Sequence, residues 1–478
     1  MKAYFKKFGI VIFAASFVIL TVVNSAMYTN RNELYQNKNH LEEVKENYLK
    51  FCAGCHGKDL ERFTGREWVF GGTPDEMFST IKNGRPSIGM PGFQKGLNDD
   101  EIQNLANYIL VELPHIGRKE RPFKSLEDTI QSENFAFILE TVVPDLDVPW
   151  GMAFLPNGDL LFTERSGLLY RFSDGEKNLI SGLPQVIEMG QGGLMDVELH
   201  PDFEQNGWIY ISFNSPAERK SDGGNTSILR ARLVNDELKD IEILFKAQPD
   251  LSSGVHFGCR LEFDGKNHLY FTVGERGTTQ NAQTLTNHCG KVHRIFDDGR
   301  IPDDNPFVGV EGAMPTIYSY GHRNPQGLAI DKKTGIIWEH EHGPKGGDEL
   351  NVILPGRNYG WPEITFGINY DGTIITNDTA KSGMEQPVYY WIPSIAPCGM
   401  DFFEGKVYKG WEGNILIGSL SYEYIERCVL EENKVIHTER LLENIGRVRN
   451  IKMGPDGYVY FSIEKPGQIL KIIPVEDF

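Results

Sequence analysis

Short apolar runs with alternating polar positions recur along the chain from residue 135 to residue 478. Each run is followed by a turn rich in Pro, Asp or Gly and then by a second alternating run, which is typical of a β-hairpin. Repeated hairpins predict an all-β, six-bladed propeller; a large β-sandwich or two all-β domains are the alternatives. The six pairs of runs cover residues 150–155 and 159–163, 195–199 and 208–212, 260–263 and 268–272, 327–330 and 335–338, 399–403 and 414–418, and 448–452 and 458–462.

The first quarter of the chain has a different pattern. Residues 47–50 are compatible with a helix, and residues 97–112 form an amphipathic helical pattern for which Asn98 is the expected N-cap. A polar stretch then separates this part from the β-rich remainder and predicts a linker. The expected organisation is a small all-α domain over residues 40–116, a linker over 117–134 and the propeller over 135–478.

The helical part contains the sequence Cys52-Ala-Gly-Cys55-His56, the pattern for covalent attachment of a c-type haem. Two thiols three positions apart can each bond one vinyl group of the porphyrin, and His56 is then placed to bind the iron. Met90, in a Gly-Met-Pro-Gly loop, offers a thioether to the other face of the iron. The alternatives are a disulfide or zinc half-site at the cysteines and simple core packing of Met90. With this motif, the helical part as a whole resembles a small class I cytochrome c.

The N-terminus agrees with a haem c, whose attachment normally takes place outside the cytoplasm. Basic residues precede an apolar run over residues 9–23 that ends in small residues, as in an export signal. The run is short of the about 20 apolar residues that a full membrane span needs. A cleaved signal over residues 1–26 is therefore favoured, with an uncleaved anchor in the inner membrane as the alternative. The sequence predicts a periplasmic or otherwise extracytoplasmic protein.

Composition narrows the choice of partners. The chain is 40% hydrophobic and 24% charged, as a globular protein is, and its formal net charge is -18. This charge repels nucleic acids and anionic membrane surfaces but leaves small neutral substrates possible. Outside the haem motif, four cysteines can form up to two disulfides in an oxidising compartment or remain buried free thiols. They are Cys259, Cys289, Cys398 and Cys428.

Polar motifs gather where the runs of the predicted blades begin or end, and propellers carry functional loops at such places. They lie at residues 190–194, 256–260, 321–327, 341–344, 347–351, 358–362, 369–370 and 446–449. Two of them are not generic propeller sequence: Tyr-Gly-His-Arg-Asn-Pro-Gln-Gly, and Asp-Glu-Leu-Asn followed by Asn-Tyr-Gly-Trp-Pro. In this order the motifs resemble the family of soluble aldose sugar and glucose dehydrogenases that depend on pyrroloquinoline quinone (PQQ), over about residues 140–475. The resemblance implies a six-bladed propeller with PQQ over the channel mouth and oxidation of a sugar at its anomeric carbon to a lactone.

PQQ carries three carboxylates, so its site needs fixed cations and hydrogen-bond donors. Arg447 and Arg449 are two residues apart on a strand-like segment, share one face, and can make forked bonds to carboxylates. The resemblance implies that Arg323 and Asn324 hold the quinone oxygens and polarise the carbon that receives hydride. Two further residues, Gln191 and Tyr370, match family positions near the cofactor and the substrate.

His256 matches the catalytic histidine of the family and is the expected general base. Oxidation at C1 needs removal of the hydroxyl proton as hydride leaves, and an imidazole suits that task near neutral pH. The adjacent Glu341 and His342 suggest a metal site, but no third nitrogen or sulfur ligand lies nearby in the sequence. The histidines without such a context, expected to be structural, are His200, His268 and His340.

The resemblance also implies calcium, which prefers carboxylate and carbonyl oxygens. One ion would bridge PQQ to the backbone carbonyls of Gly343 and Pro344. A second would take the carboxylate of Glu349 and the carbonyl of Tyr359. For Glu349 the alternative is a solvated acid in a turn.

Two positions depart from the family pattern. Ser421 stands where the family usually has a lysine that contacts PQQ, so one cation is missing. Glu275 stands where relatives tend to carry Asp, which adds one methylene near the substrate and could alter the choice of sugar.

The sequence as a whole predicts an exported quinohaem dehydrogenase for an aldose-type sugar. Electrons would pass from PQQ to the covalent haem, whose fusion to the propeller raises its effective concentration, and then to a downstream cytochrome or quinone-linked chain. One alternative is an electron-relay or ligand-binding protein whose degenerate propeller has lost PQQ, which Ser421 would suit. Another is a lactonase-type hydrolase with channel calcium, against which the cationic pair Arg447 and Arg449 speaks.

Overall fold

The computed structural model describes residues 38–56, 60, 73–85, 90–112, 128–219 and 223–475. The chain divides into a helical unit, Met1–Arg85 with Pro91–Glu120, and a β unit, Arg121–Phe478 with Pro86–Met90. The expected signal or anchor lies outside the described residues, as does most of the linker. Among the helices of the described residues, none is long and apolar enough to span a membrane.

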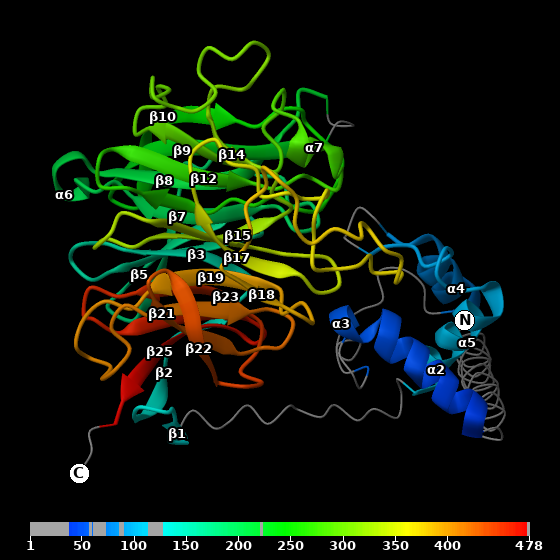
Figure 1. Ribbon diagram of the computed structural model, residues 1–478. Helices are drawn as coiled ribbons and strands as arrows, with labels where there is room; N and C mark the ends of the chain where they lie inside the picture. Colours follow the sequence, from blue (N-terminus) through cyan, green and yellow to red (C-terminus); the bar gives the residue numbers. More distant parts are fainter. Residues whose placement is uncertain are drawn as a thin grey trace, which may run out of the picture. The chain divides into compact units, whose positions relative to one another are not determined.

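Capping side chains fix the ends of the helices in the helical unit. The Thr73 side chain accepts from the Glu76 backbone N–H, and the Glu76 carboxylate accepts from the backbone N–H of Thr73 in return, a capping box. The Asn98 side chain accepts from the Glu101 N–H at 2.9 Å, which confirms the predicted N-cap. The helices are α2 (Lys38–Phe51), α3 (Ala53–His56), α4 (Pro74–Asn83) and α5 (Asp99–Glu112) (Figure 1).

The helical unit has its own apolar core, in which α5 packs against α2 and α4. The rings of Tyr48 and Tyr108 lie 5.9 Å apart between α2 and α5. The loop after Met90 packs on the end of α4, where Phe93 N–H donates to the Ile81 carbonyl at 3.0 Å. These contacts confirm the predicted all-α class. Other buried core residues are Leu41, Val44, Met77, Ile102, Leu105 and Ile109.

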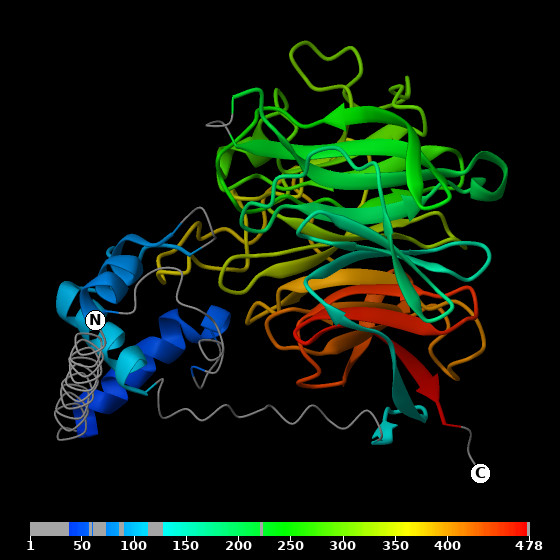
Figure 2. The same cartoon turned by 180° about the vertical axis from the view of Figure 1, so that it is seen from behind.

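The β unit is a propeller of six antiparallel sheets, here called blades 1 to 6 (Figures 1 and 2). Blade 1 contains β3 (Pro149–Phe154), β4 (Leu160–Glu164), β5 (Leu168–Ser173) and β6 (Glu176–Ile180). Blade 2 contains β7 (Leu194–Leu199), β8 (Trp208–Pro216), β9 (Gly224–Val234) and β10 (Glu237–Lys246). Blade 3 contains β11 (Leu261–Phe263), β12 (His268–Val273), β13 (Lys291–Phe296) and β14 (Ile317–Tyr320).

The other three blades complete the ring. Blade 4 contains β15 (Pro325–Ile330), β16 (Ile337–Glu341), β17 (Asp348–Ile353) and β18 (Tyr389–Trp391). Blade 5 contains β19 (Pro397–Phe402), β20 (Ile415–Ser419), β21 (Ile425–Glu431) and β22 (Lys434–Leu441). Blade 6 contains β23 (Val448–Met453), β24 (Val459–Glu464), β25 (Gly467–Pro474), β2 (Ala136–Leu146) and β1 (Ile130–Gln131). Two short helices, α6 (Phe203–Asn206) and α7 (Gln280–Gln283), lie in connections.

The six predicted hairpins correspond to the first two strands in chain order of blades 1 to 5 and to β23 and β24 of blade 6. These strands are almost wholly buried, as in β4, where all five residues are buried, so their apolar runs stand out in the sequence. Later strands are less apolar: β10 is exposed at most positions. The sequence therefore predicts the number of blades but misses their outer strands.

An N-terminal strand closes the ring of blades. β2 pairs antiparallel with β25, with Phe137 opposite Pro474 and Thr141 opposite Leu470. β1, at residues expected to form the linker, pairs with β2 and extends the same sheet. Hydrogen bonds between the two ends of the β unit thus hold the propeller shut.

Apolar clusters fill the interfaces between neighbouring blades. Leu161 of blade 1, for example, belongs to one buried cluster with Ile211 of blade 2. The four propeller cysteines are buried free thiols, so the disulfide alternative is wrong. Burial raises the pKa of the Cys259 thiol to about 12, which makes it an apolar filler rather than a reactive group.

Candidate functional site

The backbone around His256 is shaped by close contacts before β11 and after β12. His256 has a φ of 55°, in the left-handed region, and its N–H donates to the side-chain oxygen of Gln191 at 2.8 Å. A side chain at Gly274 would collide with the His256 carbonyl oxygen. The glycine lets the two loops approach and brings the next residue, Glu275, beside the imidazole.

His256 and Glu275 form a buried pair. His256 Nδ1 lies 2.5 Å from Glu275 Oε1, and the two side chains are 13% and 1% exposed. Burial lowers the pKa of His256 below 6.5, the charge of Arg323 lowers it further, and Glu275 only partly offsets both. The imidazole is therefore neutral near pH 7, with Nδ1 engaged and Nε2 available as a proton acceptor.

Arg323 and Asn324 lie in the turn between β14 and β15. Arg323 donates to the carbonyl oxygens of His342 and Gly343 at 3.0 and 2.9 Å. The side-chain oxygen of Asn324 accepts from Gly258 N–H at 3.3 Å, but Asn324 Nδ2, on a buried side chain, has no hydrogen-bond partner among the described residues. A buried donor without an acceptor fits a ligand oxygen such as that of a quinone.

Arg447 and Arg449 share one face, as the sequence predicts, and both contact Glu464. Arg447 Nε lies 2.6 Å from Glu464 Oε2, and Arg449 Nε lies 2.8 Å from Glu464 Oε1. Burial alone would raise the pKa of Glu464, but the two arginine charges lower it well below its usual range. The sequence did not predict that Glu464 belongs to this site. Arg449 also donates to the side-chain oxygen of Gln326 at 3.3 Å, and Gln326 Nε2 donates to Asn324, which connects Arg449 to the turn that carries Arg323 and Asn324.

Three of the four residues expected to bind calcium line one small cavity. Gly343, Glu349 and Tyr359 surround about 10 Å³, together with Glu341. A space of this size holds a single small guest such as a water molecule. Burial raises the pKa of Glu349, and the negative charge of Glu341 raises it further. Pro344 is buried next to Gly343.

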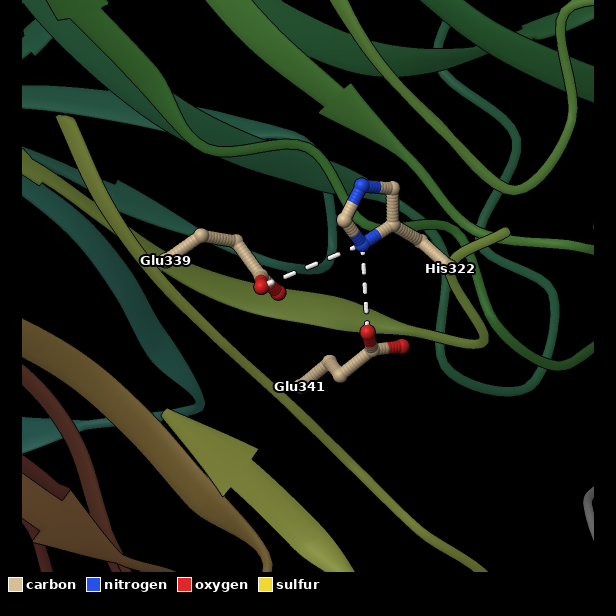
Figure 3. Close-up of side chains that lie close together, drawn as sticks. All are labelled: His322, Glu339 and Glu341. Carbon is tan, nitrogen blue, oxygen red and sulfur yellow. Dashed lines mark hydrogen bonds and ion pairs between the residues drawn. The ribbon is translucent and has the colours of Figure 1, made fainter. Parts of the chain in front are cut away.

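A buried cluster near this cavity was not predicted. His322 Nδ1 lies 3.1 Å from Glu341 Oε1 and 3.9 Å from Glu339 Oε2 (Figure 3). The adjacent His342 is not part of it, because its Nε2 lies 2.7 Å from the Pro397 carbonyl. The nitrogen of the cluster therefore comes from His322, in the turn before β15, and not from His342. The sequence hints at this cluster only through Glu339 and Glu341, which are two residues apart on a strand and therefore share a face.

The remaining predicted residues lie as follows. In the helical unit, His56 N–H donates to the Cys52 carbonyl at 2.9 Å, which puts these residues one helical turn apart. Cys52 is buried, His56 and Met90 are half-buried, and the side chain of Cys55 lies outside the described set. Tyr370 is half-buried in a turn of the 369–372 loop. Ser421 N–H donates to the Ile395 carbonyl at 3.0 Å.

Two of the histidines expected to be structural have local partners. His200 Nδ1 accepts from the Asp202 N–H at 2.9 Å, and His268 Nδ1 lies 2.8 Å from Asp264. His340 is fully buried.

Both units match known protein families. The Glucose / Sorbosone dehydrogenase family model matches residues 146–471, and the model for cbb3-type cytochrome c oxidase subunit III matches residues 39–109. The chain is 41% identical to the aldose sugar dehydrogenase YliI of Escherichia coli over 346 residues, which is 70% of this chain and 92% of that protein.

Solved structures agree with this assignment. The apo-form crystal structure of the soluble aldose sugar dehydrogenase from E. coli superposes with a TM-score of 0.68 at 39% identity, over 71% of this chain and all of that one. The PQQ-bound form of an aldose sugar dehydrogenase from Streptomyces coelicolor superposes with a TM-score of 0.59 at 29% identity, over 70% of this chain and 98% of that one. On these grounds the chain belongs to the Glucose / Sorbosone dehydrogenase family, and it carries a cytochrome c-like helical unit ahead of the propeller.

Proposed function

We propose that this protein is a quinohaem dehydrogenase that oxidises an aldose-type sugar at C1 to the lactone and passes the electrons to its own haem c. The observation that carries the proposal is the buried pair of His256 and Glu275, which presents a neutral imidazole whose Nε2 makes no hydrogen bond to the described residues. Such a group is what abstraction of a hydroxyl proton near pH 7 requires.

The chain's own residues have distinct tasks in this proposal. His256 Nε2 accepts the proton of the C1 hydroxyl. Glu275 keeps a proton on Nδ1, which fixes the ring orientation and stabilises the imidazolium that forms. The Arg323 guanidinium lies near enough to His256 to lower its pKa, and it supplies positive charge where negative charge develops.

The donor set fits PQQ, which when bound supplies the two-electron oxidant. Asn324 Nδ2, which has no hydrogen-bond partner in the described part of the chain, would donate to a quinone oxygen. Both arginines contact Glu464, but the side chain of Arg447 is 26% exposed and that of Arg449 only 10%, so Arg447 is the cation more accessible to a carboxylate of the cofactor. Calcium at the Gly343–Glu349–Tyr359 cavity would add positive charge, which matters because Ser421 stands where the family resemblance implies a lysine.

The remaining parts of the proposal concern electron transfer and location. Cys52 and Cys55 would hold the haem, with His56 and Met90 as iron ligands, and a downstream cytochrome or quinone-linked acceptor would receive the electrons. The basic and apolar N-terminus supports a periplasmic or otherwise extracytoplasmic location, with residues 9–23 as export signal or tether.

The test is reconstitution of the purified full-length chain with PQQ and Ca²⁺, followed by addition of single aldoses. We expect the α-band of ferrous haem c to appear with the right sugar, and the matching lactone to be found by mass spectrometry. Omission of PQQ should prevent both changes.

A second candidate is an electron-relay protein that has lost PQQ. Two observations favour it: Ser421 leaves the site short of a cation, and Glu464 already occupies the carboxylate-binding edge of both arginines. It predicts that PQQ neither binds nor makes any aldose reduce the haem, while a chemical reductant still does.

A further inference from the structure

The cluster of His322, Glu339 and Glu341 has a geometry that suits a metal ion. Their candidate ligand atoms all lie within 4.8 Å of one another, and the side chains are 0%, 0% and 5% exposed. Figure 3 shows both carboxylates directed at the same edge of the imidazole. Ligand atoms in adjacent positions around a metal with bonds of about 2.0–2.2 Å lie about 3 to 3.5 Å apart, close to the 3.1 and 3.9 Å seen here.

The charges in the cluster are not balanced by a permanent cation. Two acids are buried together, and a buried carboxylate is costly unless it is paired. Arg323 contacts Glu341 only through its backbone N–H, while its guanidinium donates to the carbonyls of His342 and Gly343. Among the described residues, no lysine or arginine side chain forms an ion pair with Glu339 or Glu341.

One oxygen of the cluster has no partner. Glu339 Oε2 accepts from Asn351 Nδ2 at 3.2 Å, but Glu339 Oε1 has no hydrogen bond within the part of the chain that the structure describes. Buried polar atoms nearly always have a partner, so an orphaned oxygen in a fully buried acid points to a ligand that completes the site.

The ring nitrogen of His322 that faces away from the two acids, Nε2, contacts a hydroxyl group. His322 Nε2 lies 2.9 Å from Ser319 Oγ. A donor bond from Nε2–H to this hydroxyl would leave the lone pair of Nδ1 facing the two carboxylates, an arrangement that is repulsive without a cation between them. Metal-bound histidines commonly have their second nitrogen fixed by such a bond.

We propose that His322, Glu339 and Glu341 bind a divalent cation of the Mn²⁺ or Zn²⁺ type, at a position that adjoins the calcium position expected at Glu349 and Tyr359, whose cavity Glu341 also lines, but that has its own ligand set. An imidazole ligand selects such metals, whereas Ca²⁺ takes oxygen ligands. The ion ties β16 to the turn that continues into Arg323 and Asn324, so it is a structural support for that turn. The site does not depend on whether the protein oxidises sugar.

Mn²⁺ uptake by the full-length haem protein tests the proposal. The protein is treated with a chelator and exchanged into excess Ca²⁺, which fills oxygen-only sites. Mn²⁺ is then titrated at room temperature, and the loss of the free-ion signal is followed by electron paramagnetic resonance. We expect one tightly bound Mn²⁺ per chain that excess Ca²⁺ does not displace and that Zn²⁺ does.

Two isosteric variants locate the ion. Glu339→Gln should weaken Mn²⁺ binding by about tenfold or more. Glu349→Gln is the matched control, because it removes a neighbouring buried acid that also accepts from Asn351 but leaves the three side chains of the cluster in place. Haem absorption and circular dichroism confirm that each variant is folded. Loss of Mn²⁺ binding in both variants, or in neither, would overturn the assignment. A wild-type protein that takes up no Mn²⁺ would overturn it too, and would mean that the two acids are stabilised by shared protons instead of a metal ion. Because neither sugar nor PQQ is used, the result is independent of the proposed function.

Discussion

His256 Nδ1 lies 2.5 Å from Glu275 Oε1, deep enough that Glu275 is only 1% exposed. A carboxylate on one ring nitrogen defines the other as the proton acceptor, and it counteracts part of the pKa depression that burial imposes on the imidazole. In the proposed mechanism, Glu275 is thus a positioning residue for His256. From the sequence alone, Glu275 was expected only to affect the choice of sugar. Its contact with His256 suggests that it also orients the imidazole.

Removal of the base should stop sugar oxidation without removing the haem. His256→Ala should lower kcat by roughly 10²–10⁴, because proton abstraction is lost while the proposed PQQ contacts remain. Stopped-flow absorbance would show haem reduced by a chemical reductant but not by sugar. The matched control is His268→Ala, which breaks another His–acid pair, with Asp264, and should leave kcat unchanged. Haem reduction by sugar at the wild-type rate in His256→Ala would exclude this residue from the mechanism.

The role of Glu275 can be read from a pH profile. In the wild type, the acid limb of kcat/KM should lie below pH 6.5, since burial lowers the pKa of His256. Glu275→Gln removes the charge that raises this pKa, so the limb should move to still lower pH. The rate on the plateau should fall by roughly 10²-fold, because an amide can donate to Nδ1 and favour the wrong tautomer. A shift of the limb to higher pH would contradict the assignment.

The sequence predicts the propeller well because the inner strands are buried and begin with runs of apolar residues, as in β4 and β20. Closure by β2 is not visible in the sequence, since a pairing such as Phe137 with Pro474 joins opposite ends of the unit and no local pattern encodes it. The helix cap at Asn98 is local and was predicted correctly.

Partners in the site are harder to predict than the site residues themselves. Glu464 and Glu339 are ordinary strand acids in the sequence, and only the fold brings them to Arg449 and His322. Such pairs join residues from different strands or turns, so the spacing of residues along the chain does not predict them.

Haem ligation by Met90 has a direct optical signature. Sulfur-to-iron bonds in ferric haem c give a weak near-infrared charge-transfer band. We expect this band in the wild type and its loss in Met90→Ala, together with a lower haem reduction potential, because the thioether is a ligand that raises it. Met77→Ala, at a buried methionine of α4, is the control and should keep the band. A wild-type spectrum without the band would show that Met90 is not the ligand.

Calcium removal should weaken both activity and stability. An ion that binds only the folded state stabilises it by mass action, so exhaustive chelation should lower Tm in calorimetry and abolish sugar oxidation, and added Ca²⁺ should restore both. Glu349→Gln should raise the Ca²⁺ concentration needed for recovery. Glu363→Gln, at an exposed acid paired with Lys381, should not. Unchanged Tm and activity after chelation would rule out a calcium requirement.

The contacts of Glu464 with Arg447 and Arg449 should make a pH-dependent contribution to stability. The arginine charges lower the pKa of Glu464 below its ordinary 4.5, so the ionised acid stabilises the fold above pH 4.5 and this contribution disappears as the pH falls further. Glu464→Gln leaves two arginines without their anion and should destabilise the propeller by about 3 kcal/mol near pH 7, as removal of one partner of a buried ion pair does. Urea unfolding followed by fluorescence should show the difference from the wild type shrinking towards pH 3. Glu412→Gln, which breaks an exposed pair with Lys333, is the control and should leave the unfolding midpoint unchanged at both pH values. A wild-type advantage that stays constant from pH 7 to pH 3 would mean that ionisation of Glu464 is not its source.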